Sequence, residues 1–232
     1  MSLTRCFIVL LLSTSGLYST PWWLHNHEPQ FLLIFNPAGD AQYAGRMVQD
    51  TTARSITHQL AHQLEFYLHR KYGSTVKVLV THRPFDALSP WQVASFVNQW
   101  RASLVISLEC FEDNQPRPRL FVYQTAGQST PIAHPDTLTV YRADQTYLAH
   151  SPQTQTYAEQ LCNQLQNQLD ARWECSGPHA LPLAPLKGMV VPALLLEIGL
   201  KDKDDWRALA EPLGLALYNV AHTHQNTQHA HD

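Results

Sequence analysis

Residues 31–35 read FLLIF, a continuous apolar run that Asn36, Pro37 and Gly39 bring to an end. An apolar run without polar alternation is typical of a strand that is buried on both faces, as in a parallel sheet. Similar runs recur along the chain. We expect further strands at VKVLV (76–80), LVISL (104–108), LFVY (120–123), LTVY (138–141) and VPALLL (191–196).

Helical patterns separate these runs. Ile56, Leu60, Leu64 and Leu68 repeat at helical spacing, and Ser89 with Pro90 forms an N-cap and a first-turn proline. The expected helices cover residues 51–72, 89–100, 154–172 and 204–220, with a bend or break in the last one at Pro212. Strands that alternate with helices predict an α/β fold: one domain with a mainly parallel twisted sheet and helices on both faces.

The two ends of the chain differ from this central region. Residues 1–20 have a basic start, the apolar run Cys6–Leu12 and then small residues, the order of a secretory signal peptide or an N-terminal anchor. We therefore expect export to the periplasm or cell envelope. Residues 28–221 form the predicted domain, and residues 222–232 a flexible histidine-rich tail.

Composition excludes two classes of partner. The formal net charge is -3, which gives no electrostatic basis for binding nucleic acid. The predicted domain has no uninterrupted apolar stretch of about 18 residues, so we expect no membrane span in it.

Polar residues follow three of the expected strands. Asn36–Asp40 comes after the first, Glu109 after the strand at 104–108, and Glu197 after the strand at 191–196. Ligands of open α/β sheets bind at the carboxyl ends of the strands. A carboxylate that ends a run as apolar as VPALLL must be paired, metal-bound, protonated or at the edge of a cleft. Glu197 is therefore either a site residue or a carboxylate held for structural reasons.

Several segments, in the correct order, resemble the zinc-dependent N-acetylmuramoyl-L-alanine amidases. Val191–Gly199 is similar to the family's PAVLVE-G-F segment, whose glutamate acts in catalysis, and Phe31–Asp40 is similar to its opening IVIDPGHGG. Residues 78–86, followed by residues 94–107, resemble its second strand, Thr-Arg-x-x-Asp turn, Ala-Asn helix and ADLFISIH strand. The matching positions are Arg83, Asp86, Asn98 and Ser107.

The resemblance implies a zinc site that this chain has lost. Active members hold zinc with two histidines and one glutamate and leave one position open for the attacking water. Gly39 and Glu109 stand where the histidines belong, and Ala53 where the ligand glutamate belongs. The resemblance therefore predicts no zinc cofactor and leaves Glu197 as a vestigial catalytic residue. The vestigial cleft would comprise Asn36, Gly39, Asp40, Ala53, Arg83 and Glu109.

Two other groups of side chains could supply metal ligands. Asp40, Glu109 and Glu197 would form an oxygen-only set suited to a harder ion such as magnesium or calcium. His58 and His62 have zinc-like spacing, but together with Glu65 and His69 they form a stripe that is more typical of a solvated helix face. We also expect Arg83 to pair with Asp86 within its own turn.

These patterns lead to one preferred interpretation and two alternatives. The preferred one is an exported, catalytically silent amidase-like module that binds peptidoglycan, envelope proteins or both as a scaffold. The first alternative is a divergent amidase or hydrolase with a rebuilt metal site around Glu197, Glu109 and Asp40. The second is a structural subunit in which bulky side chains fill the former cleft over Glu197.

Overall fold

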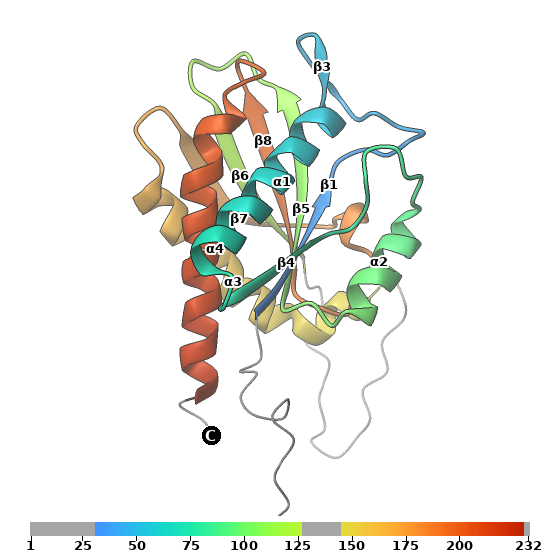
Figure 1. The fold of residues 1–232 in the computed structure, drawn as a ribbon, viewed down its shortest axis with the longest axis vertical. Helices are drawn as coiled ribbons and strands as arrows, with labels where there is room; N and C mark the ends of the chain where they lie inside the picture. The colour runs from blue at the N-terminus through green and yellow to red at the C-terminus, as the bar shows by residue number, and fades with distance from the viewer. Residues whose placement is uncertain (1–30, 127–144, 230–232) are drawn as a thin grey trace, which may run out of the picture.

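Six strands form one twisted sheet in the computed structural model, which describes residues 31–126 and 145–229 (Figure 1). The strand order is β4-β1-β5-β8-β6-β7, and all neighbours are parallel except the antiparallel pair β6–β8. The strands are β1 (Phe31–Pro37), β4 (Val76–Val80), β5 (Leu104–Glu112), β6 (Arg119–Thr125), β7 (Glu174–Leu181) and β8 (Ala193–Leu200). The predicted mainly parallel sheet is confirmed.

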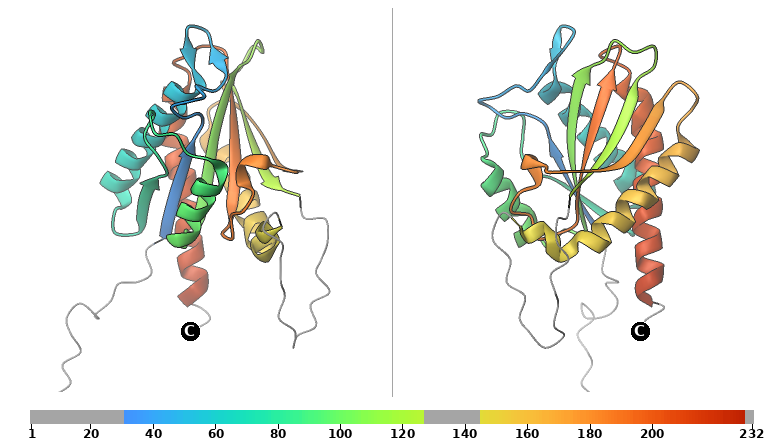
Figure 2. Two further views of the ribbon diagram at one scale, coloured as in Figure 1. Left: turned by 90° about the vertical axis from the view of Figure 1, so that its right-hand side faces the viewer. Right: turned by 180° about the vertical axis from the view of Figure 1, so that it is seen from behind.

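Helices cover both faces of this sheet, as predicted. One apolar cluster joins alternate strand residues such as Leu33 and Phe35 to α1 (Ala53–Tyr72), α3 (Ser151–Gln168) and α4 (Trp206–His229). The other cluster joins Ile34 and Val105 to α2 (Pro90–Gln99) and the short 3₁₀ helix η3 (Ala184–Leu186). Seen from behind, the sheet lies in front of α1 and α4 (Figure 2). A second 3₁₀ helix, η2 (Thr146–His150), precedes α3.

Local capping fixes where two of the helices begin. The side chain of Thr52 accepts a hydrogen bond from the N–H of Ser55 at 3.3 Å and starts α1. Ser89 and Gln92 form a reciprocal capping box, with Pro90 in the first turn of α2. The expected start of α2 is therefore confirmed at the level of its hydrogen bonds.

One edge strand and one short hairpin were not predicted from the sequence. The edge strand β7 has mostly exposed or half-exposed residues and contains Gly177–Pro178, so it lacks an apolar run. The hairpin β2 (Met47–Val48) with β3 (Thr51–Thr52) has only two residues in each strand. This hairpin lies at the end of the domain to which the arrows of β5 and β8 point (Figure 1).

The prediction of a loose tail from His222 onward was wrong for residues 222–229. Helix α4 continues to His229, because its polar residues still find partners on the domain. His224 Nδ1 lies 2.9 Å from the hydroxyl oxygen of Tyr157, and the His224 ring packs edge-on against Phe31. Pro212 lies within α4 and does not end it.

The interpretation of His58 as a solvent-facing residue was also wrong. His58 is only 2% exposed, in the same class as Leu60 and Leu64. Its ring packs edge-on against His82, which follows β4, so α1 is covered by this loop as well as by the sheet. The stripe keeps its solvated character only further along α1, where His62 pairs with Glu65 at 3.1 Å.

Some predictions concern residues outside the described ranges. They are the leader at 1–20, the strand at 138–141, and the start of the domain at residue 28. Within residues 31–126 and 145–229, no helix combines the length and apolar character needed to cross a membrane.

Candidate functional site

The site lies where the carboxyl ends of β1, β5 and β8 meet. Asn36 is in register with Ser107 across β1 and β5, and Glu109 with Glu197 across β5 and β8. Residues in register on neighbouring parallel strands point to the same face of the sheet. The two glutamates are therefore adjacent on the face that carries α2.

Arg46 approaches these carboxylates from the loop before the β2–β3 hairpin. Its Nη1 lies 2.7 Å from Oε1 of Glu197, and its guanidinium packs over the Phe111 ring. The backbone carbonyl of Arg46 accepts a 2.7 Å hydrogen bond from the N–H of Ala53, which anchors the loop to the start of α1. A loop residue thus supplies the positive charge beside the paired glutamates.

A cavity of about 330 Å³ opens beside Glu109. It is bounded by the loop after β1, the N-terminal part of α2 and η3. Its lining comprises Asn36, Pro37, Ala38, Gly39, Asp40, Tyr43, His82, Leu88, Pro90, Val93, Ser107, Glu109, Ala184 and Pro185. The surface beside Glu109 is therefore hollow, whereas Glu197 lies outside this lining and is paired with Arg46.

A chain of hydrogen bonds holds one wall of the cavity. The Asn36 amide donates to Ser107 Oγ at 3.2 Å, and the Thr81 hydroxyl lies 2.9 Å from Asn36 Oδ1 and 2.7 Å from His82 Nδ1. His82 Nε2 lies 2.8 Å from the backbone carbonyl oxygen of Gly39. The polar atoms of this wall thus have partners within the wall.

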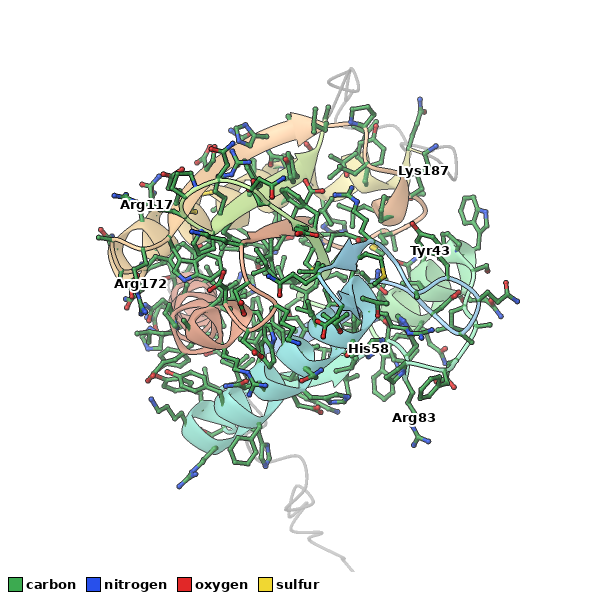
Figure 3. The ribbon with its side chains drawn as sticks, turned by 90° about the horizontal axis from the view of Figure 1, so that it is seen from above. Tyr43, His58, Arg83, Arg117, Arg172 and Lys187 are labelled. Atoms are coloured by element: carbon green, nitrogen blue, oxygen red, sulfur yellow. The ribbon has the colours of Figure 1, made fainter. Side chains whose placement is uncertain are left out.

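Asp40 and Arg83 form hydrogen bonds within their own turns instead of reaching toward Glu109 and Glu197. Asp40 Oδ1 accepts the N–H groups of Gln42 and Tyr43 at 2.8 and 2.7 Å, and these bonds lower the pKa of the carboxyl group. The N–H of Arg83 donates to Asp86 Oδ2 at 2.9 Å, while the Arg83 side chain is exposed and points away from the domain (Figure 3). The predicted place of Arg83 in the cleft is therefore wrong.

Burial and charge shift the ionisation of the central groups. Burial raises the pKa of Glu109, the nearby Arg46 charge opposes that shift, and Glu197 adds to it. Burial, and then the charge of Glu197, raises the pKa of Tyr123 on β6. Burial raises the pKa of the Cys110 thiol to about 12, so this thiol is not a nucleophile near neutral pH. The centre is thus a pair of carboxylates with one guanidinium.

The aligned zinc-ligand positions do not fit zinc. Gly39 and Ala53 offer no side-chain donor, and Glu109 offers only a carboxylate beside the positive charge of Arg46. Gly39 has a φ of 73°, and a Cβ at this position would lie 2.7 Å from the carbonyl oxygen of Tyr43. The loop is thus shaped for glycine. In the described part of the chain, no three His, Cys, Asp or Glu side chains are grouped to hold a metal ion.

Together these features define an α/β domain whose site lies toward the carboxyl ends of parallel strands, with a glutamate in the carboxyl-terminal half of β8. The sequence profile of the N-acetylmuramoyl-L-alanine amidases matches residues 37–221. The chain belongs to this family. A search of curated proteins found no match.

Solved structures of amidases share the fold. The Ami1 amidase of Mycobacterium smegmatis is 11% identical with a TM-score of 0.59, covering 83% of this chain and 97% of its own. An amidase of Clostridium difficile 630 is 13% identical with a TM-score of 0.55, covering 82% and 96%. The catalytic domain of CwlV from Bacillus (Paenibacillus) polymyxa is 13% identical with a TM-score of 0.53, covering 81% and 96%.

The structure brings together most of the residues that the sequence singled out. Asn36, Gly39, Asp40 and Glu109 line one cavity, Glu197 is in register with Glu109, and Ala53 is bonded to the Arg46 backbone. Three residues of the site were missed: Arg46, His82 and Tyr123. The sequence did not indicate Arg46, because Arg46 lies in a loop and its partner Glu197 is 151 positions away.

Proposed function

We propose that this protein is a catalytically silent member of the amidase family that binds peptidoglycan, a cell-envelope protein or both. The observation that carries the proposal is the ion pair between Arg46 and Glu197, at 2.7 Å. In this pair the glutamate matched to the catalytic one has a guanidinium as its partner. Family membership supports the cell wall as the place of action.

The chemistry of amide hydrolysis supports the silent state. Free water has a pKa of about 15.7, and a bound metal lowers it enough to form a nucleophile near neutral pH. Glu109 and Glu197 are acceptors and supply neither that activation nor a positive charge for the tetrahedral oxyanion. Arg46 carries such a charge, but Glu197 neutralises it. The proposed loss of zinc therefore implies the proposed loss of amide cleavage.

The test is digestion of purified peptidoglycan with analysis of the released stem peptides. We expect no release from the wild type or from Glu197→Ala, and retention of the wild type on sedimented peptidoglycan or on an envelope protein. Elemental analysis of the untagged protein should find no stoichiometric zinc. Peptides that are released by the wild type and lost in Glu197→Ala would overturn the proposal.

The register of Glu109 and Glu197 favours a second candidate, a divergent amidase or hydrolase with a rebuilt metal site. Two adjacent carboxylates are suitable ligands for a hard cation, but Asp40 Oδ1 is already bonded to its own turn. This candidate predicts peptide release that depends on added magnesium or calcium. A lack of release with either ion would exclude it.

We also propose that the protein is exported to the periplasm or cell envelope. One support is the order of residues 1–20, which is typical of a leader. The other is membership of the N-acetylmuramoyl-L-alanine amidase family, whose name refers to a bond of the cell wall. Mass spectrometry of the protein from its native host should find a new N-terminus between about residues 16 and 25, or an uncleaved anchor in the membrane fraction. Intact Met1 on a cytoplasmic protein would contradict export.

A further inference from the structure

Glu109 is a half-buried carboxylate that accepts no hydrogen bond from the described residues. Its side chain lines the cavity from the carboxyl-terminal half of β5, and the contributions that shift its ionisation are burial and the charges of Arg46 and Glu197. In the described residues, no hydrogen bond reaches its carboxylate, whereas Arg46 donates to Glu197 instead. A carboxylate that is partly removed from water without a donor is costly, so a ligand that brings donors would be stabilised here.

The charges around the cavity select the kind of donor. Its lining contains two carboxylates, Asp40 and Glu109, and no lysine or arginine. Asp40 Oδ1 already accepts two backbone N–H groups, and both ring nitrogens of His82 have partners in the wall. Glu109 is therefore the carboxylate of the lining that accepts no hydrogen bond from the described residues, and its charge favours a cationic donor over an anionic ligand.

The size and the remaining lining limit the ligand further. A volume of about 330 Å³ is near the lower end of ligand cavities, which range from roughly 300 to 1,000 Å³. Most of the other lining residues are apolar: Pro37, Ala38, Leu88, Pro90, Val93, Ala184 and Pro185. The cavity thus suits a short apolar group with one charged end.

We propose that this cavity binds a primary ammonium group, with the free amino terminus of a short peptide as its source and with Glu109 as the acceptor. The inference rests on the proposed peptidoglycan-binding function. Hydrolysis of the bond between the muramoyl group and L-alanine leaves a free amino group on the alanine. The module would therefore recognise the stem peptide that amidase cleavage releases, without performing the cleavage itself.

The experiment is an NMR titration of the full chain with matched probes. The first probe is L-alanyl-L-alanine amide with a free amino terminus, the second is its N-acetylated form, and the third is n-pentylamine. We expect the free peptide to bind at least about tenfold more tightly than the acetylated one, the scale of one charge-assisted hydrogen bond. Tighter binding of n-pentylamine than of the free peptide would assign the site to alkyl ammonium groups instead of amino termini.

Two variants and one control assign the effect to the cavity. Glu109→Gln should lose the preference for the free amine, and Ala184→Trp should block the cavity from the exposed η3 side without disturbing the core. Glu112→Gln is the control, because Glu112 is an exposed carboxylate on the same strand that accepts the N–H of Gln49. Equal affinity for the free and acetylated peptides, or a preference that survives both variants, would overturn the inference.

Binding to sedimented peptidoglycan, measured in parallel, separates the two proposals. Retention on peptidoglycan without any preference for the free amine would contradict only the ammonium site. Loss of retention on peptidoglycan together with a clear Glu109-dependent preference for the free amine would contradict the scaffold function. The ammonium site would still be supported.

Discussion

His58 and Glu109 are both ionisable side chains without a hydrogen-bond partner among the described residues, yet their surroundings differ. His58 is enclosed, with both ring nitrogens unpartnered, and burial followed by the nearby His82 lowers its pKa to about 4. Glu109 borders a cavity and lies near Arg46, and burial raises its pKa. A neutral imidazole is tolerated in a closed core, whereas a carboxylate at a cavity retains a need that a ligand can meet.

The comparison shows that burial alone does not identify a functional site. His58 contacts a neighbouring ring and the core, and it does not line the cavity. Glu109 combines partial burial, a missing donor and an adjacent open volume. The two groups also predict opposite dependence of stability on pH, and this difference provides tests.

The largest expected effect concerns His58. Its pKa is about 4 in the folded protein, against 6.5 as the ordinary value, so the unfolded chain takes up this proton first as the pH falls. The free energy of unfolding should therefore decrease between about pH 6.5 and pH 4, by up to about 3 kcal/mol from this group. Urea unfolding of the wild type and of His58→Leu at pH 7 and pH 4.5 measures the difference.

His62→Leu is the matched control for this prediction. His62 lies one turn further along α1, is exposed and pairs with Glu65. Its replacement should leave the pH dependence close to that of the wild type. If His58→Leu and the wild type lose the same stability on acidification, His58 is not a neutral buried group in the folded protein.

The His58 result also shows how far sequence reasoning extends. The apolar runs around Ile34, Ile106 and Leu194 predicted the central strands, because a strand covered on both faces has no polar alternation to obscure it. The pattern in α1 failed at His58, because the loop after β4 covers a second side of the helix, and periodicity alone does not reveal such a cover.

Site residues on strands were predictable, and those on loops were not. Glu109 and Glu197 stand at the ends of apolar runs, so the edge of the sheet at which they meet could be predicted, but both lie inside β5 and β8 and not after these strands as expected. Arg46 lies in the loop before the β2–β3 hairpin, and the path of this segment depends on contacts with α1 and with Lys201, which follows β8. Arg83 matched a family position, but its backbone serves a turn and its side chain points outward.

A smaller effect is expected at Glu109. Its raised pKa means that the folded state disfavours the charged carboxylate, so the group lowers stability above its ordinary pKa of 4.5. Glu109→Gln should therefore raise the free energy of unfolding at pH 7 by up to about 1 kcal/mol, and the gain should vanish as the pH falls toward 4. Chemical unfolding across this pH range is the measurement, and a gain that is unchanged at pH 4 would contradict the assignment.

The smallest effect is expected at Arg46, and it tests whether the ion pair is structural or belongs to the site. The Arg46 side chain is 55% exposed and that of Glu197 is 20% exposed, so solvent screens much of their attraction. Arg46→Ala should lower the free energy of unfolding at pH 7 by about 0.5–1 kcal/mol, slightly more than Lys71→Ala, which removes a similar but more exposed pair with Glu211.

The measurement that distinguishes a structural pair from a site pair is the pKa of Glu109, followed by NMR of its side-chain carboxyl. Arg46 opposes the rise in this pKa, so Arg46→Ala should raise it further, whereas Lys71→Ala should leave it unchanged. An unchanged pKa of Glu109 in Arg46→Ala would mean that the guanidinium serves Glu197 alone and is not shared by the carboxylate pair.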